Sequence, residues 1–335
     1  MASMLRTEAF RERLADGRRV AAGLEADGHR APVAGVWAAL LAVWVFWGGT
    51  YLAIRVVVGT MPPFLAASVR FLLAGAILYA VAVRRGDREG DRPNRAQWLA
   101  ATIIGGSLLV GGNGLVMFAE QSVPSGITAL IIASVPLWFA VIDRIVFRRR
   151  LSWPAVLGLA IGFGGLALLV NPTGGRLDPA GVAALLVASL SWAGGSLYAR
   201  HATLPKRPLV GTGMEMLAGG VLLALVAAVR GEFARFDVAA VSLESALGLV
   251  YLIVFGSLVA FAAYVWLLRV TRTTLVSTYA YVNPVVAVFL GWAVLAEPIT
   301  AWTLVAGGII VVAVALIVSA RPAKQRPEAS GAAEP

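Results

Sequence analysis

Long stretches without a charged side chain divide the chain into segments of membrane-spanning length. Two apolar runs, 62–83 and 208–229, each contain a single charge, Arg70 and Glu215 respectively. About 20 apolar residues cross a hydrocarbon core of roughly 30 Å as a helix, and solid rather than alternating runs favour helices over barrel strands. The pattern predicts an all-α integral membrane protein with ten transmembrane helices. The other eight runs, of 21 to 25 residues, contain no Asp, Glu, Lys or Arg: 31–54, 96–119, 121–142, 151–175, 179–199, 245–268, 273–296 and 298–320.

The basic residues between these runs predict an orientation. Most of the 28 Lys and Arg residues fall in the two ends of the chain and in alternate loops. Because Lys and Arg accumulate in cytoplasmic loops, both termini of this expected multi-pass plasma-membrane protein should lie in the cytoplasm. Residues 1–33 contain no apolar core of a secretion signal and are expected to form a cytoplasmic tail or a short surface helix. Residues 321–335, rich in Pro, Ala, Glu and Lys, are expected to form a disordered cytoplasmic tail. The basic segments are 1–30, 84–95, 148–150, 200–207, 269–272 and 321–326.

The two halves of the chain are diverged copies of one unit. A shift of 145 residues superposes the first two helices on helices six and seven, and slightly larger shifts place Pro136 on Pro284 and Gly158 on Gly307. We expect repeats over 35–171 and 179–320. Five helices per unit, an odd number, oblige the second copy to enter the membrane from the opposite side, so the repeats are inverted. The pairs at 145 are Trp47 and Trp192, Gly49 and Gly194, Arg55 and Arg200, Pro63 and Pro208, Leu72 and Leu217, Gly75 and Gly220, and Leu78 and Leu223.

Composition excludes several kinds of chemistry. The chain is 59% hydrophobic and 14% charged, with a mean hydropathy of +0.82. It has no cysteine and two histidines, which excludes disulfides, thiolate chemistry and a multi-histidine metal site. Its two lysines follow no glycine-rich phosphate loop, which disfavours ATP-driven transport. The net charge is +10, but the basic residues lie between apolar runs rather than on one face of a soluble domain, so no nucleic-acid partner is expected.

We therefore expect a transporter with no cofactor or metal, whose partners are a small-molecule substrate and the lipid bilayer. A membrane enzyme would need clustered His, Ser, Asp or metal ligands near one interface. A structural or assembly protein would not explain a duplicated, inverted unit. The glycines Gly158, Gly162 and Gly307 predict either tight helix packing or a homodimer.

Four segments resemble the EamA family of the drug/metabolite transporter superfamily, and within it the YedA-like group of bacterial inner-membrane exporters. The resemblance implies ten helices in two inverted repeats around a central cavity. It also implies export of metabolites, amino acids or amphipathic drugs by alternating access, with uptake as the alternative. One departure is that the acidic residue that the family often carries after the fourth helix of each half is present as Glu297 but replaced by Arg148 to Arg150 in the first half. The segments are 46–55 (Phe-Trp-Gly-Gly-Thr-Tyr-Leu-Ala-Ile-Arg), 61–75, 120–138 (beginning Glu-Gln-Ser-Val-Pro-Ser-Gly) and 281–298 (beginning Tyr-Val-Asn-Pro).

Arg70 and Glu215 are the first candidates for solute binding. Arg70 is the ninth residue of its run and Glu215 the eighth, and the 145-residue shift superposes them. Eight residues at 1.5 Å rise is about 12 Å, which places both near the middle of the membrane. A charge there needs a partner or a wet cavity. We expect them to face the cavity or to pair across the pseudo-two-fold axis; the alternative is that each bonds separately to local backbone or to a neighbouring helix.

The remaining candidates are polar, aromatic and proline residues of matched helices. Pro136 and Pro284, in mid-helix, would free the carbonyls of Ile132 and Ala280 for a solute, or would only bend their helices. Glu120 would bind a cation or a proton, or be a solvated carboxylate at the interface. The other cavity candidates are Trp47, Trp192, Asn113, Trp138, Tyr279, Tyr281 and Asn283. Arg55 and Arg200 are expected to anchor helix ends, and Asp143 and Arg144 to snorkel.

Overall fold

A computed structural model describes residues 32–84, 93–146, 148, 151–170, 177–271 and 273–319. The expected tails 1–33 and 321–335 lie almost wholly outside these ranges. The contacts within the chain separate residues 1–37 from residues 38–335. Only residues 32–37 of the first unit, where α2 begins, are described.

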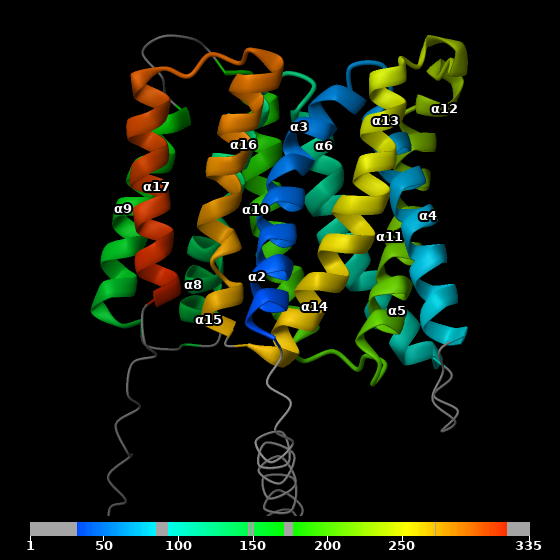
Figure 1. Ribbon diagram of the computed structural model, residues 1–335, viewed down its shortest axis with the longest axis horizontal. Helices are drawn as coiled ribbons and strands as arrows, with labels where there is room; N and C mark the ends of the chain where they lie inside the picture. Colours follow the sequence, from blue (N-terminus) through cyan, green and yellow to red (C-terminus); the bar gives the residue numbers. More distant parts are fainter. Residues whose placement is uncertain are drawn as a thin grey trace, which may run out of the picture. The chain divides into compact units, whose positions relative to one another are not determined.

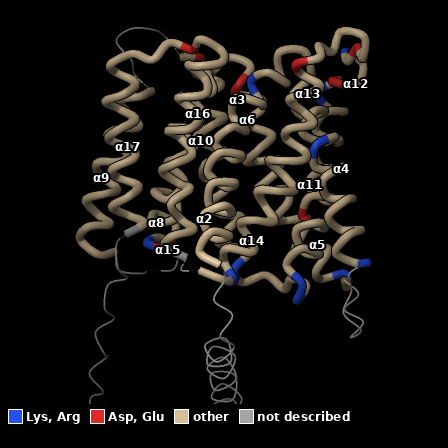
Figure 2. Tube along the Cα trace, in the orientation of Figure 1, with Lys and Arg blue, Asp and Glu red and all other residues tan. Residues whose placement is uncertain are grey.

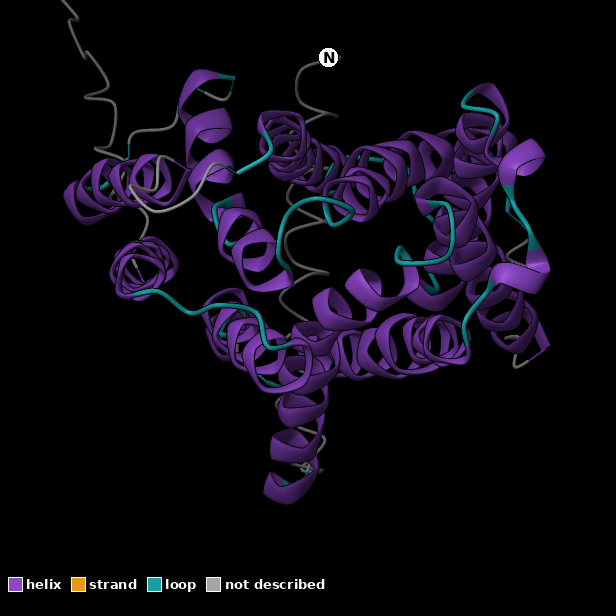
Figure 3. Ribbon diagram, turned by 90° about the horizontal axis from the view of Figure 1, so that it is seen from above, coloured by secondary structure: helices purple, strands orange, loops and turns teal. Residues whose placement is uncertain are grey.

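Every regular element in the described ranges is a helix (Figures 1 and 3). Nine helical stretches are apolar and long enough to cross a membrane, and a shorter tenth, Tyr279–Leu295, lies between the last two of them. This confirms the predicted all-α membrane fold. In chain order the spans are α2 (Val33–Ala42), η1 (Val43–Trp47) and α3 (Gly48–Val57); α4 (Pro63–Arg84); α5 (Arg95–Gly105), η2 (Gly106–Gly114) and α6 (Leu115–Ala119); α7 (Ser125–Ile132) and α8 (Val135–Ile145); α9 (Trp153–Val170); α10 (Pro179–Ala199); α11 (Pro208–Val229); α13 (Leu243–Tyr251), η4 (Leu252–Val259) and α14 (Ala260–Val270); α15 (Thr273–Val276) and α16 (Tyr279–Leu295); and α17 (Ala301–Ser319). Short α12 (Glu232–Arg235) and η3 (Val238–Ala240) join α11 to α13.

The two ends of the bundle differ in charge (Figure 2). We call the basic end the one that carries Arg84, Arg95, Arg148, Arg207 and Arg269. The acidic end carries most of the described carboxylates. These acidic-end carboxylates are Glu120, Asp178, Glu232, Asp237, Glu244 and Glu297.

Helices α4 and α11, the second helix of each repeat, pack against each other through glycines. A Cβ added to Gly75 would lie 2.9 Å from the amide nitrogen of Leu217, and one added to Gly220 would lie 3.0 Å from the amide nitrogen of Leu72. The 145-residue shift exchanges these two contacts, so the interface is reciprocal. Glycine allows the helix backbones to approach this closely, as in other membrane helix pairs.

The three glycines that were expected to mediate tight packing or a homodimer pack against other helices of the same chain. A Cβ on Gly158 would lie 2.7 Å from Ile317 of α17, and one on Gly162 would lie 2.4 Å from Leu137 of α8. Gly307 of α17 faces Leu130 of α7. These contacts represent the packing alternative, and a homodimer remains a prediction that does not rest on them.

Within the described ranges, three spans contain π-helical turns and two are broken: the fourth, and the ninth, where Ser277 and Thr278 separate α15 from α16. The π-helical segments η2 and η4 lie at matched positions of helices three and eight, whereas η1 has no matched π-helical segment in α10. The fourth span breaks at Ser134, and Pro136 stands in the first turn of α8. The prediction of a mid-helix proline at 136 was therefore wrong, because the chain ends one helix before the proline and begins another. Pro284 does lie inside α16.

Candidate solute-binding cavity

A cavity of about 1890 Å³ lies between the helices of both repeats. At one extreme its walls include Asp143, Arg148 and Ser152, so it reaches the basic end. At the other extreme its walls stop at Ile54 and Ala129, and none of the described residues 117–128 contributes to it. The cavity therefore opens toward the basic end and is closed at the acidic end.

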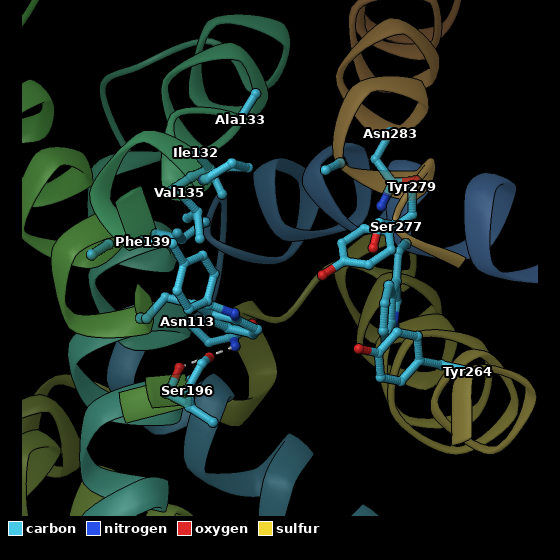
Figure 4. Close-up of a pocket in the computed structure, with 18 of the residues that line it drawn as sticks. Asn113, Ile132, Ala133, Val135, Phe139, Ser196, Tyr264, Ser277, Tyr279 and Asn283 are labelled. Atoms are coloured by element: carbon cyan, nitrogen blue, oxygen red, sulfur yellow. Dashed lines mark hydrogen bonds between the residues drawn. The ribbon is translucent and has the colours of Figure 1, made fainter. Parts of the chain in front are cut away.

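Aromatic rings form one wall of this cavity. The Trp47 ring centroid lies 5.2 Å from that of Tyr264 and 5.3 Å from that of Tyr279, and the two tyrosine rings are 5.8 Å apart. Trp47 is fixed because its Nε1 donates a 3.0 Å hydrogen bond to the carbonyl of Gly256 in η4. Across the cavity from the tyrosines lies Phe139 (Figure 4). An apolar or aromatic part of a solute would be held between these walls.

Arg70 brings a positive charge into the same cavity. Its side chain is buried, at 4% exposure, and its Nε donates a 2.9 Å hydrogen bond to the hydroxyl of Ser257 in η4. Its guanidinium carbon lies 4.6 Å from the centre of the Phe71 ring. The Nη1 atom has no hydrogen-bond partner among the described residues. The hydrogen bond of Nε thus holds the Arg70 side chain in place, and Nη1 remains available to bind a solute.

Glu215 of α11 lines the cavity as well, but it does not pair with Arg70. No ion pair joins the two in the described part of the chain. Both side chains line the cavity, and Arg70 also bonds to Ser257 of a neighbouring helix, which is the separate bonding given as the alternative. A solute can therefore meet a positive and a negative group separately.

Of the other predicted residues, three lie outside the cavity and the rest line it. Glu120 is fully buried at the acidic end, so the expectation of a solvated carboxylate was wrong. Trp138 packs edge-on against Phe163 of α9 at 5.4 Å, and Tyr281 packs against the apolar core. These three are not among the residues that line the cavity. Those that do line it are Trp47, Trp192, Asn113, Pro136, Tyr279, Asn283 and Pro284.

Several lining residues were expected only to end helices. Arg200 lines the cavity with its guanidinium 5.6 Å from the centre of the Phe139 ring, and Asp143 and Arg148 line its mouth. Ser257 and Tyr264 were not singled out at all. The signal for Arg200 was present in the repeat, since an inverted copy of Arg55 must lie at the opposite membrane face. No comparable signal marks Ser257, because its role depends on the turn geometry of η4.

The acidic end is closed by contacts between segments distant in sequence. Glu297, which follows α16, accepts hydrogen bonds from the amide and hydroxyl of Ser125, at 2.8 and 3.0 Å, and from the amide of Gly126, at 3.1 Å. The carboxylate thus caps the first turn of α7. Arg55 of α3 donates to the backbone carbonyl of Glu120. The carboxylate aligned with the family pattern therefore has a structural role in this conformation.

Replacing Glu297 with alanine should loosen the start of α7. Losing a helix cap costs about 0.5–2 kcal/mol, so we expect a small drop in thermal stability. We also expect faster hydrogen exchange at the amides of Ser125 and Gly126, measured by mass spectrometry. Glu297→Gln keeps one acceptor oxygen and should fall between alanine and the native protein. Unchanged exchange in the alanine variant would contradict the capping role.

The architecture alone indicates the class of protein. Two inverted five-helix repeats around a cavity that is closed at one end have the plan of a secondary transporter. Comparison with known proteins shows that the chain belongs to the EamA-like transporter family, which it matches over residues 33–171 and 179–319. It is a multi-pass membrane protein of a transporter family, and the family indicates transport rather than an enzymatic activity.

The relatives agree with this assignment. The chain is 41% identical over 287 residues to the uncharacterized inner membrane transporter YedA of Escherichia coli strain K12, covering 84% of this chain and 90% of that one. It is 26% identical to Protein PecM of Dickeya dadantii, covering 81% and 88% of the two chains. A solved crystal structure has the same fold with a TM-score of 0.59 at 22% identity, covering 85% and 96% of the two chains. The similarity to YedA supports an inner-membrane location.

Proposed function

We propose that the protein exports small amphipathic solutes from the cytoplasm by alternating access. The observation that carries this proposal is the cavity, which opens at the basic end and is closed at the acidic end. Basic loops face the cytoplasm, so the basic end is the inner one and both termini are cytoplasmic. In this orientation the structure is the inward-open state, in which a cytoplasmic solute can enter.

Matched residues of the two repeats support the alternating part of the proposal. Arg55 lies at the closed end and contacts the backbone of Glu120, whereas its counterpart Arg200 lies in the cavity near the open end. Glu297 holds the closed end, whereas Arg148, at the corresponding place after the first-repeat helix, lies at the mouth. In inverted-repeat carriers the two halves exchange conformations between states. The contacts at the two ends are then expected to alternate.

The lining residues support an amphipathic solute with both signs of charge. Arg70 offers guanidinium hydrogen to an anionic group, Glu215 offers a carboxylate to a cationic group, and the Trp47 wall accommodates an apolar body. Amino acids and zwitterionic metabolites or drugs have this chemistry. The volume of about 1890 Å³ would hold a solute together with water.

Reconstitution into liposomes tests the proposed function. Vesicles with the purified protein should accumulate or release labelled zwitterionic amino acids faster than protein-free vesicles, because a passive bilayer opposes charged groups. The panel should include a purely cationic dye and a purely anionic acid as matched comparisons. Oriented vesicles, loaded on one side at a time, would separate export from uptake. Correctly folded protein that moves no member of the panel would contradict a carrier.

A further inference from the structure

The carboxyl group of Glu120 is buried and has no hydrogen-bond partner in the described part of the chain. Glu120 follows α6 at the closed acidic end, its side chain is 0% exposed, and neither carboxylate oxygen meets a donor among the residues described. Arg55 is nearby, but its guanidinium donates to the backbone carbonyl of Glu120 rather than to the carboxylate. The cavity does not reach Glu120.

An ionised carboxylate in this position would be unfavourable. Burying an unpaired charge costs several kcal/mol, and a buried group changes its protonation state instead. Burial raises the pKa of Glu120 well above its usual range, the neighbouring carboxylate of Glu297 raises that pKa further, and Arg55 lowers it. The neutral acid is therefore the form that fits the closed end.

The other charged or titratable groups near α6 do not supply a counter-charge. Tyr51 of α3 is close enough to interact electrostatically with Glu120. Asp178, at the start of α10, accepts a 2.7 Å hydrogen bond from the hydroxyl of Ser122 and is itself acidic. The guanidinium carbon of Arg230 lies 5.2 Å from the centre of the Phe118 ring, and its Nε lies 3.8 Å from a carboxylate oxygen of Glu232.

We propose that Glu120 is a proton-binding site: the proton is bound while the acidic end is closed and is released when that end opens to water. The inference goes beyond solute export, because it adds a second ligand, the proton, that acts on conformation. At the opposite end, the matched sequence position carries no carboxylate. The shift of 148 residues that places Pro136 on Pro284 places Leu268 on Glu120, so protonation acts on one of the two closures.

The direction of the pH effect follows from linkage. The closed form binds the proton more tightly than the open form, so raising the pH favours opening of the acidic end and lowering it favours closure. A single proton changes the open-to-closed ratio by at most about tenfold per pH unit. The effect begins above the ordinary glutamate pKa of 4.5, because only there do the two forms differ in bound protons.

Because the chain has no native cysteine, an introduced one can report opening. Ile132 lines the cavity on α7, and a reagent from the acidic side reaches it only when that end opens. We propose to label Ile132→Cys in intact cells with a membrane-impermeant maleimide at an external pH of about 6 and of about 8, because linkage changes the open-to-closed ratio over this interval. Val238→Cys, 74% exposed at the acidic end, corrects for thiol ionisation. The corrected labelling rate should rise with pH.

Glutamine at position 120 mimics the protonated acid. In an Ile132→Cys background, Glu120→Gln should keep labelling slow and remove its corrected pH dependence. Glu244→Gln, the same change at an exposed carboxylate of the acidic end, should behave like the parent. A pH-independent rate in the parent overturns the proposal, and this result needs no variant at Glu120 to fold. Persistence of the full pH dependence in Glu120→Gln also overturns it. Absence of labelling at every pH contradicts alternating access as well.

Discussion

Replacing Arg70 with glutamine is expected to remove binding and transport of solutes that carry a carboxylate. The Arg70 Nε is held by Ser257, and its Nη1 has no partner among the described groups, so this nitrogen remains available to an anionic group of the solute. Breaking a buried, hydrogen-bonded charge pair costs about 2–5 kcal/mol, or roughly 30-fold or more in affinity. Equilibrium binding and liposome flux, measured with the same labelled solute, test this expectation.

Two variants make the Arg70 result specific. Arg269→Gln removes the same charge from an exposed position of α14 that does not line the cavity, and it should bind solute as the native protein does. Combining Arg70→Glu with Glu215→Arg should not restore binding, because the two native groups make no ion pair in the described structure. Native affinity in Arg70→Gln would refute the anion-binding role, and restored affinity in the swapped protein would show that the pair forms in another state.

Leucine at Gly75 is expected to prevent α4 and α11 from packing. The added Cβ alone would lie 2.8 Å from the Cβ of Met216 and 2.9 Å from the backbone nitrogen of Leu217. A backbone atom cannot rotate away as a side chain can, so the helices must separate. Overpacking commonly costs about 1–3 kcal/mol, and we expect the upper part of this range or more. The yield of monodisperse protein after heating, measured by size-exclusion chromatography, reports the loss of stability.

The reciprocal contact offers a second variant, and the chain offers a control. Gly220→Leu should be as harmful as Gly75→Leu, because its Cβ would approach Leu72 in the same way. Gly164→Leu makes the same change in α9, where a Cβ would meet no described atom within 4 Å, and it should be tolerated. Equal stability of Gly75→Leu and Gly164→Leu would show that the close approach of α4 and α11 is not needed for the fold.

Most of the fold could be predicted from the sequence because the membrane makes apolar length and loop charge strong signals. The ten spans required only run lengths, and the repeat required only a shift of the chain against itself. The break at Ser134 and the π-helical turns η2 and η4 were not predictable in this way. Both kinds of segment are as apolar as the regular helix around them, so hydropathy does not distinguish them.

The cavity residues were harder to predict than the spans. Arg70 and Glu215 stood out because a charge inside a membrane helix is rare. Arg200 and Asp143 were assigned to helix ends because a sequence does not show where a cavity mouth crosses the interface. Glu120 was expected to be solvated for the same reason, since burial at a helix end depends on how α3 and α16 close over it. The position of a residue along its helix predicts its depth in the membrane, but it does not predict which neighbours cover its side chain.

The reciprocal contact of Gly75 with Leu217 and of Gly220 with Leu72 bears on how this chain arose. Two identical five-helix proteins, inserted in the same membrane in opposite directions, would meet through one self-complementary surface of this form. The present α4 and α11 interface retains that geometry within a single polypeptide. Fusion of two such antiparallel subunits into one polypeptide would leave an interface of this form.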